Sequence, residues 1–128
     1  MATLPRDEQI AILLEKDQGG PISMLNLLKF KDFAEYPDGR DSGLSGKEAY
    51  MRYGDLVAEQ VAKLGGDFKF AGNANALVIG DGELQWDLIV VAQYPSVAAF
   101  IEMLNSPEYQ EIHVHREAGL AHQLLVQC

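Results

Sequence analysis

Apolar residues follow two different spacings along this chain of 128 residues. From Ile22 to Phe30 they occupy both parities of a short run that glycine and proline precede, which predicts a strand covered on both faces. The stretches 67–80 and 84–94 also read as strands, and a Gly-Asp-Gly turn separates them. Small residues at 72–76 predict a bulge or bend in the first of these two. The C-terminal stretch 120–128 predicts a closing strand.

Between these stretches the apolar residues recur every three or four positions, as in amphipathic helices. Ser45 and Glu48 form the S-x-x-E pattern that caps the start of a helix, and two glycines end the segment that follows. Ser96 predicts the start of a second helix, and Ser106-Pro107 that of a third. Residues 5–17 predict a short N-terminal helix. The apolar stripe of the first capped helix consists of Tyr50, Tyr53, Gly54, Val57, Val61 and Leu64.

The order of these elements predicts an α+β protein with a ferredoxin-like β-α-β-β-α-β fold, an antiparallel sheet and an extra N-terminal helix. We expect a single domain, in which residues 1–20 form an N-terminal extension and residues 21–128 the core. Helices can cover only one face of such a sheet, yet the first strand is apolar on both faces. A twofold partner that packs sheet against sheet would cover the second face, so we predict a homodimer.

Charge and cysteine content narrow the class of protein. The formal net charge of −9 repels phosphate groups, so neither nucleic acid nor an anionic membrane surface is expected as a partner. The longest apolar runs are too short to span a bilayer. Cys128 is the only cysteine, which rules out an intrachain disulfide and suits a reducing compartment. With no secretory leader pattern at the N-terminus, we expect a cytoplasmic protein.

Two histidines, His113 and His115, raise the question of a metal site. On the predicted helix they point roughly 200° apart, because each residue turns the helix by about 100°. A chelating pair would need positions i and i+4 on a helix, or i and i+2 on a strand. We therefore predict no metal site and no cofactor. Arg116 falls on the face of His113, where it could also be a simple C-terminal helix charge, and His115 could form a surface pair with Glu111.

Polar residues interrupt several apolar segments. An unpaired buried carboxylate is costly, so Asp87 must have a partner such as Arg116, face a wet cavity as a base of raised pKa, or lie at a strand end. Asn26 could bind the backbone or point at a ligand. Tyr50 and Tyr53 are most simply core residues, although a phenol near a pocket can donate a hydrogen bond to a substrate oxygen.

Several stretches together resemble the longer members of the domain of unknown function 1330 family, over about residues 24–120. The matching stretches are MLNLLKFK (24–31), SGKEAYMRY (45–53), Gly65-Gly66, Ile79-Gly80, Trp86-Asp87, YPSVAAFIEM (94–103) and SPEYQEIHVHREAGL (106–120). The resemblance implies a dimeric α/β-barrel, in which two ferredoxin-like sheets pack face to face. Proteins of that superfamily include cofactor-independent monooxygenases, lactone isomerases, dye-decolourising and haem-degrading enzymes, and ligand-binding modules. The polar positions that match are Asn26, Tyr50, Tyr53, Asp87, Tyr109, His115 and Arg116.

Two functions agree with these residues, and a third is simple to test. The first is a cofactor-independent enzyme, of isomerase or monooxygenase type, that acts on a small apolar metabolite. The second is a non-catalytic dimeric module that binds a small ligand. The third, haem binding through a histidine, would give a Soret band after addition of haem. The catalytic candidates are Asp87 or His115 as general base with Arg116 stabilising negative charge on oxygen, and the ligand-binding candidates are Asn26, Tyr50, Tyr53 and Tyr109.

Overall fold

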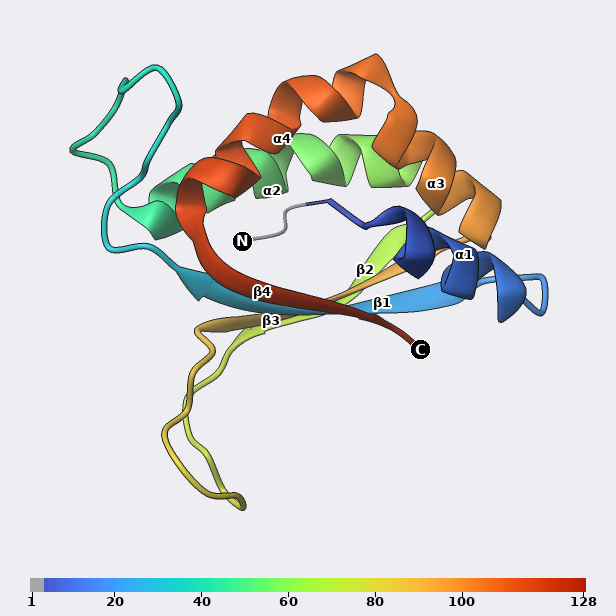
Figure 1. Ribbon diagram of the computed structural model, residues 1–128, viewed down its shortest axis with the longest axis horizontal. Coiled ribbons are helices and arrows are strands. Elements are labelled where there is room, and N and C mark those ends of the chain that lie inside the picture. The colour runs from blue at the N-terminus through green and yellow to red at the C-terminus, as the bar shows by residue number, and fades with distance from the viewer. Residues whose placement is uncertain (1–3) are drawn as a thin grey trace.

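Four antiparallel strands form one sheet whose order is β2-β3-β1-β4 (Figure 1). The computed structural model describes residues 4–128, so the first three residues of the predicted N-terminal extension lie outside the described part. The strands are β1 (Ile22–Phe30), β2 (Asp67–Asn73), β3 (Leu88–Tyr94) and β4 (Leu120–Gln127). Strand β1 pairs with both β3 and β4. The predicted ferredoxin-like order is thereby confirmed.

The helices lie on one side of this sheet, with α2 and α4 side by side (Figure 1). The helices are α1 (Asp7–Glu15), α2 (Gly46–Lys63), α3 (Val97–Asn105) and α4 (Pro107–Gly119). All three predicted caps are present. The Ser45 hydroxyl accepts a hydrogen bond from the Glu48 amide, and the Ser96 and Ser106 hydroxyls accept equivalent bonds at the starts of α3 and α4. These caps satisfy amide groups that have no partner within the helix.

The core lies between the helices and the covered face of the sheet. Burial alternates along β1 and β3, so one parity of each strand faces the helices. Buried side chains on that face include Ile22, Met24, Asn26, Leu28, Val90, Ala92 and Tyr94. From α2, both Tyr50 and Tyr53 are buried in the same cluster, which confirms that they are core residues. The opposite parity is half-buried and combines the apolar residues Leu25, Leu27, Ile89 and Val91 with Ser23, Lys29 and Gln93 at its ends.

The two strands of the hairpin are shorter than the sequence pattern predicts. Instead of 67–80 and 84–94, β2 ends at Asn73 and β3 begins at Leu88. Residues 74–87 form a long connection that extends away from the helices (Figure 1). The side chains that directly follow β2, those of Ala74, Asn75 and Ala76, are small, and the larger Leu77, Val78 and Ile79 beyond them are exposed. The pattern therefore predicted the two elements correctly but misplaced their ends.

The bulge in β2 also lies earlier than predicted. The register shifts between Phe68 and Phe70, and not within 72–76. Gly72 has a different role, because a Cβ atom there would lie 2.7 Å from the Phe70 ring. The glycine therefore leaves room for an aromatic ring on the same strand.

Helices α2 and α4 approach closely where α2 begins and α4 ends. A Cβ atom on Gly46 would lie 2.7 Å from the carbonyl oxygen of Gly119. That carbonyl also accepts a hydrogen bond of 2.8 Å from the amide of Lys31, just after β1. Two residues without side chains therefore let helix α4 end against both α2 and β1, which fixes the position of Arg116 one turn earlier.

Candidate functional site

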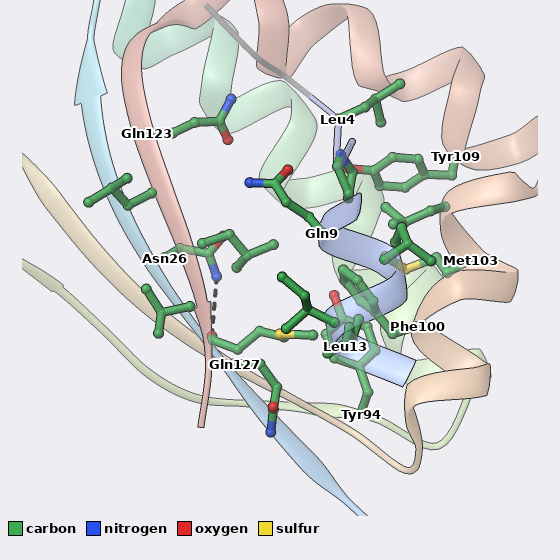
Figure 2. Close-up of a pocket in the computed structure, with 18 of the residues that line it drawn as sticks. Leu4, Gln9, Leu13, Asn26, Tyr94, Phe100, Met103, Tyr109, Gln123 and Gln127 are labelled. Carbon is green, nitrogen blue, oxygen red and sulfur yellow. Dashed lines mark hydrogen bonds between the residues drawn. The ribbon is translucent and has the colours of Figure 1, made fainter. Parts of the chain in front are cut away.

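A cavity of about 470 Å³ lies between the sheet and helices α1, α3 and α4 (Figure 2). Its size is within the usual range of small-molecule pockets, roughly 300–1,000 Å³. Apolar side chains form most of the wall, among them Leu13, Met24, Tyr94, Phe100, Met103 and Leu125. Polar side chains line another part, namely Asn26, Tyr53, Tyr109, Arg116 and Gln123.

Helix α1 forms the outer wall of this cavity. Figure 2 shows Gln9 and Leu13 pointing from α1 toward the side chains of the sheet and of α3. Leu13 packs against the core although no residue of α1 is itself buried. Few buried contacts therefore hold α1 on the body of the protein.

Arg116 is at the centre of the polar lining. It lies on the same face of α4 as Tyr109 and His113, as predicted, and only 6% of its surface is exposed. Its Nε and Nη2 atoms donate to Oε1 of Gln123 at 3.0 and 2.6 Å, and Nη2 also donates to Oδ1 of Asn26 at 3.4 Å. Arg116 does lie in the last turn of α4, as the alternative of a C-terminal helix charge required, but it is buried and bonded to Asn26 and Gln123.

The charge of Arg116 has no carboxylate partner within residues 4–128. Instead, its guanidinium lies 5.8 Å from the ring centre of Tyr50 and 5.2 Å from that of Tyr53. Burial alone would lower the pKa of Arg116, but the phenols of Tyr53, Tyr50 and Tyr109 keep this pKa above its ordinary value. Among residues 4–128, the hydrogen-bond partners of this permanent positive charge are neutral groups.

Two tyrosines extend this polar lining. The hydroxyls of Tyr53 and Tyr109 lie 2.9 Å apart, and both side chains are buried. Burial raises the pKa of Tyr109 well above its usual value, and raises the pKa of Tyr50 to about 12. Tyr109 is therefore protonated at neutral pH. One hydrogen bond uses one of their two hydrogens, so the pair retains one O–H donor.

Asp87 lies away from this cavity. It directly precedes β3, and its carboxylate accepts hydrogen bonds from the Phe30 amide at 2.9 Å and from Nζ of Lys29 at 3.3 Å. The predicted pairing with Arg116 is wrong, whereas the alternative of a residue at a strand end is confirmed. The carboxylate joins the end of β1 to the start of β3.

His115 also points elsewhere. Its Nδ1 lies 2.7 Å from the hydroxyl of Tyr36, a residue of the connection between β1 and α2. Burial and the neighbouring charge of Arg52 lower the pKa of His115. A bond to Tyr36 replaces the predicted surface pair with Glu111. His113, by contrast, is buried beside Tyr109, so the two histidines do face different sides of α4.

Within the described residues, no group of three or more His, Cys, Asp or Glu side chains could hold a metal ion. The cavity also contains residues that the sequence pattern did not single out as site residues, above all Gln123, Leu13 and Phe100. Gln123 pairs with Leu28 across the sheet, so it lies on the covered face. A polar residue of that parity in an apolar strand is the same signal that identified Asn26.

Comparison with protein families gives a direct match. The model of the domain of unknown function DUF1330 matches residues 43–127. The chain belongs to the DUF1330 family. A search of curated proteins finds no match. Helix α1, which forms the outer wall of the cavity, precedes the matched residues.

This DUF1330 protein is similar over nearly its whole length to the RPA0582 protein, described as a protein of unknown function from Rhodopseudomonas palustris. A crystal structure of the methylated RPA0582 protein is 38% identical, with a TM-score of 0.89 over 99% of this chain and 93% of that one. A second is 36% identical, with a TM-score of 0.87 over 98% and 94%. Helix α1 lies within this similarity.

More distant structures share the fold alone. A dimeric ferredoxin-like protein of unknown function from Thermobifida fusca is 19% identical, with a TM-score of 0.51 over 87% of this chain and 92% of that one. A Caulobacter crescentus protein, provisionally described as an antibiotic biosynthesis monooxygenase, is 13% identical, with a TM-score of 0.57 over 89% and 92%. In the described part of the DUF1330 protein, no helix has the length and apolar character needed to cross a membrane.

Proposed function

We propose that this DUF1330 protein binds a small, mostly apolar molecule in the cavity beneath α1. The observation that carries the proposal is the chemistry of the lining, in which a connected set of buried donors adjoins an apolar wall. Pockets of this kind bury the apolar body of a ligand, while a few polar groups set its orientation.

The residues divide into two roles. Met24, Phe100 and Leu125 contact the body of the ligand. Asn26, Tyr53, Tyr109 and Arg116 orient its polar end. Tyr50 lies outside this lining, and its ring lies within cation–π distance of the Arg116 guanidinium.

An enzymatic role at the same cavity is the second candidate. The Arg116 guanidinium and the phenol pair are donors that stabilise negative charge developing on a substrate oxygen, as an isomerase or a cofactor-independent monooxygenase requires. The description of the Caulobacter crescentus protein agrees with this at the level of fold. Asp87 and His115 lie outside the cavity lining, so this version of the proposal does not use either as the base.

Native mass spectrometry of the purified protein tests ligand binding, together with fluorescence titration of Nile red, a neutral apolar probe. Leu125→Trp would fill the cavity, and Leu56→Trp, on the exposed side of α2, is the matched control. We expect the wild type and Leu56→Trp to hold a small molecule or the probe, and Leu125→Trp to lose it. Binding that persists in Leu125→Trp would contradict the proposal. Conversion of a co-purified ligand on incubation would favour the enzyme.

We further propose that the protein is a cytoplasmic homodimer that pairs through the open face of its sheet. In support, Leu25, Leu27, Ile89 and Val91 form an apolar surface on that face, and the Thermobifida fusca protein is described as dimeric. Light scattering after size exclusion tests this: Leu27→Asp should give a monomer, whereas Leu56→Asp on α2 should remain dimeric. A monomeric wild type at micromolar concentration would contradict the proposal.

A further inference from the structure

We infer that the ligand of this cavity is a monocarboxylate with an apolar body, and that Arg116 binds its carboxylate. The inference rests on the proposed binding function and adds the chemical class of the ligand. It starts from one feature, a buried guanidinium whose hydrogen-bond partners among the described residues are uncharged.

Burial of an unpaired charge is costly, and proteins usually offset it with an opposite charge. Here the two amide partners of Arg116, Asn26 and Gln123, supply oxygen atoms that hold the guanidinium without neutralising it. No Asp or Glu within residues 4–128 forms an ion pair with it. An anionic ligand would supply the missing charge in a place that water reaches poorly.

The hydrogen-bond count leads to the same class of ligand. A guanidinium has five N–H donors; the amide oxygens of Asn26 and Gln123 use three of them, and the hydroxyls of Tyr53 and Tyr50 also hydrogen-bond with Arg116. The Tyr53–Tyr109 pair adds one further O–H donor in the lining of the same cavity. A carboxylate accepts up to about four hydrogen bonds through its two oxygens, so it can use donors of both kinds.

The charge of the lining limits the ligand to one negative charge. Arg116 is a buried cation of the lining, and Lys16, which directly follows α1, is exposed. The net charge of −9 on the whole chain disfavours ligands with several negative charges, such as nucleotides. The space of about 470 Å³ lies within the usual range of small-molecule pockets, roughly 300–1,000 Å³, so it has room for the apolar body of a small monocarboxylate.

A purely structural role for Arg116 is the alternative, since its bonds join α4 to β1 and β4. The two roles differ in one measurable property. A structural arginine stabilises the fold but does not distinguish between ligands. An arginine that binds the ligand makes the wild-type protein prefer a carboxylate over the amide of the same shape.

Calorimetric titration at pH 7 with two matched pairs tests the inference: 4-phenylbutanoate against 4-phenylbutanamide, and octanoate against octanamide. In the wild type we expect each carboxylate to bind at least about tenfold more tightly than its amide. The carboxylate forms a charge-assisted hydrogen bond to Arg116 that the neutral amide lacks, and this contact provides the difference in affinity. Arg116→Gln should reduce this preference to less than about threefold. Lys63→Gln, which removes an exposed charge at the end of α2, should keep it. The wild-type comparison holds even if Arg116→Gln fails to fold.

The outcomes separate this inference from the proposed function. Equal binding of acid and amide would overturn the carboxylate assignment and leave the binding function standing. A preference that disappears in Lys16→Gln but persists in Arg116→Gln would overturn the role of Arg116. If neither member of either pair binds, and native mass spectrometry finds no ligand, both proposals fail.

Discussion

Arg116 and Gln123 join the last helix to the last strand through one oxygen atom. Both Nε and Nη2 of the guanidinium donate to Oε1 of Gln123, at 3.0 and 2.6 Å. The end of α4 and the start of β4 lie between the two residues. A neutral amide therefore fixes the direction of a buried positive charge without neutralising it.

Replacement of Gln123 by leucine should destabilise the protein by about 1.5–3 kcal/mol, the usual value of hydrogen bonds to a charged group. The substitution leaves two guanidinium hydrogens without their acceptor inside the protein. Gln127→Leu changes an exposed glutamine on the same face of β4 and should alter stability by less than about 0.5 kcal/mol. Urea denaturation measures both. Equal effects of the two substitutions would show that the bonds to Arg116 do not stabilise the fold.

The hydroxyls of Tyr53 and Tyr109 should prove energetically coupled. Each Tyr→Phe substitution leaves the other hydroxyl buried without its 2.9 Å partner, whereas the double substitution removes both groups together. The double variant should therefore be less destabilised than the sum of the single variants, by about 0.5–1.5 kcal/mol. A double-mutant cycle in urea measures this coupling. Strict additivity would mean that the two hydroxyls do not interact in solution.

Alkaline pH should destabilise the protein through its buried phenols. Burial raises the pKa of Tyr50 from 10.0 to about 12, so the unfolded chain ionises first. The stabilisation is present in full below pH 10 and is lost between pH 10 and about 12, by about 1.4 kcal/mol per pH unit for each such phenol. Burial shifts the pKa of Tyr109 in the same direction. Urea denaturation at several pH values across this range gives the free energy of unfolding, which should fall less steeply with pH in Tyr50→Phe than in the wild type. The same pH dependence in both proteins would contradict the pKa shift.

Two glycines should respond to alanine in opposite directions. A Cβ atom on Gly119 would lie 2.9 Å from the amide nitrogen of Tyr50, so Gly119→Ala should force α4 away from α2 and cost at least about 2 kcal/mol. Nothing lies within 4 Å of a Cβ atom on Gly54, inside α2. Gly54→Ala should therefore stabilise the helix by about 0.5–1 kcal/mol. Thermal unfolding separates the two, and a neutral Gly119→Ala would disprove the close approach.

Local signals in the sequence were enough to predict the helices and the order of the strands. A serine cap and its partner amide lie within three residues, so Ser45 and Ser106 could be recognised without tertiary structure. The face of α4 that carries Tyr109 and Arg116 followed from the turn angle of a helix. The ends of β2 and β3 could not be predicted in the same way, because a strand ends where its neighbour stops pairing.

Contacts between distant segments explain what the sequence could not supply about the site. Asp87 is bonded to Lys29, on a strand that lies far from it in the sequence, and no periodicity indicates that pairing. The same holds for α1, whose spacing predicts a helix but not a position over the cavity. Asn26 could be identified as unusual from its apolar surroundings, yet its contact with Arg116 required the structure.

The most direct test of the account is to locate the bound carboxylate by NMR. Addition of 4-phenylbutanoate to isotope-labelled protein should shift the side-chain amides of Asn26 and Gln123, the Nε–H of Arg116 and the amides of α1. The signals of backbone amides at the far end of α2 and in the connection 74–87 should not shift. Saturable shifts confined to the residues around Arg116 are the predicted result. Shifts that avoid this region, or none at saturating ligand, would contradict the claim that the cavity beneath α1 is the binding site.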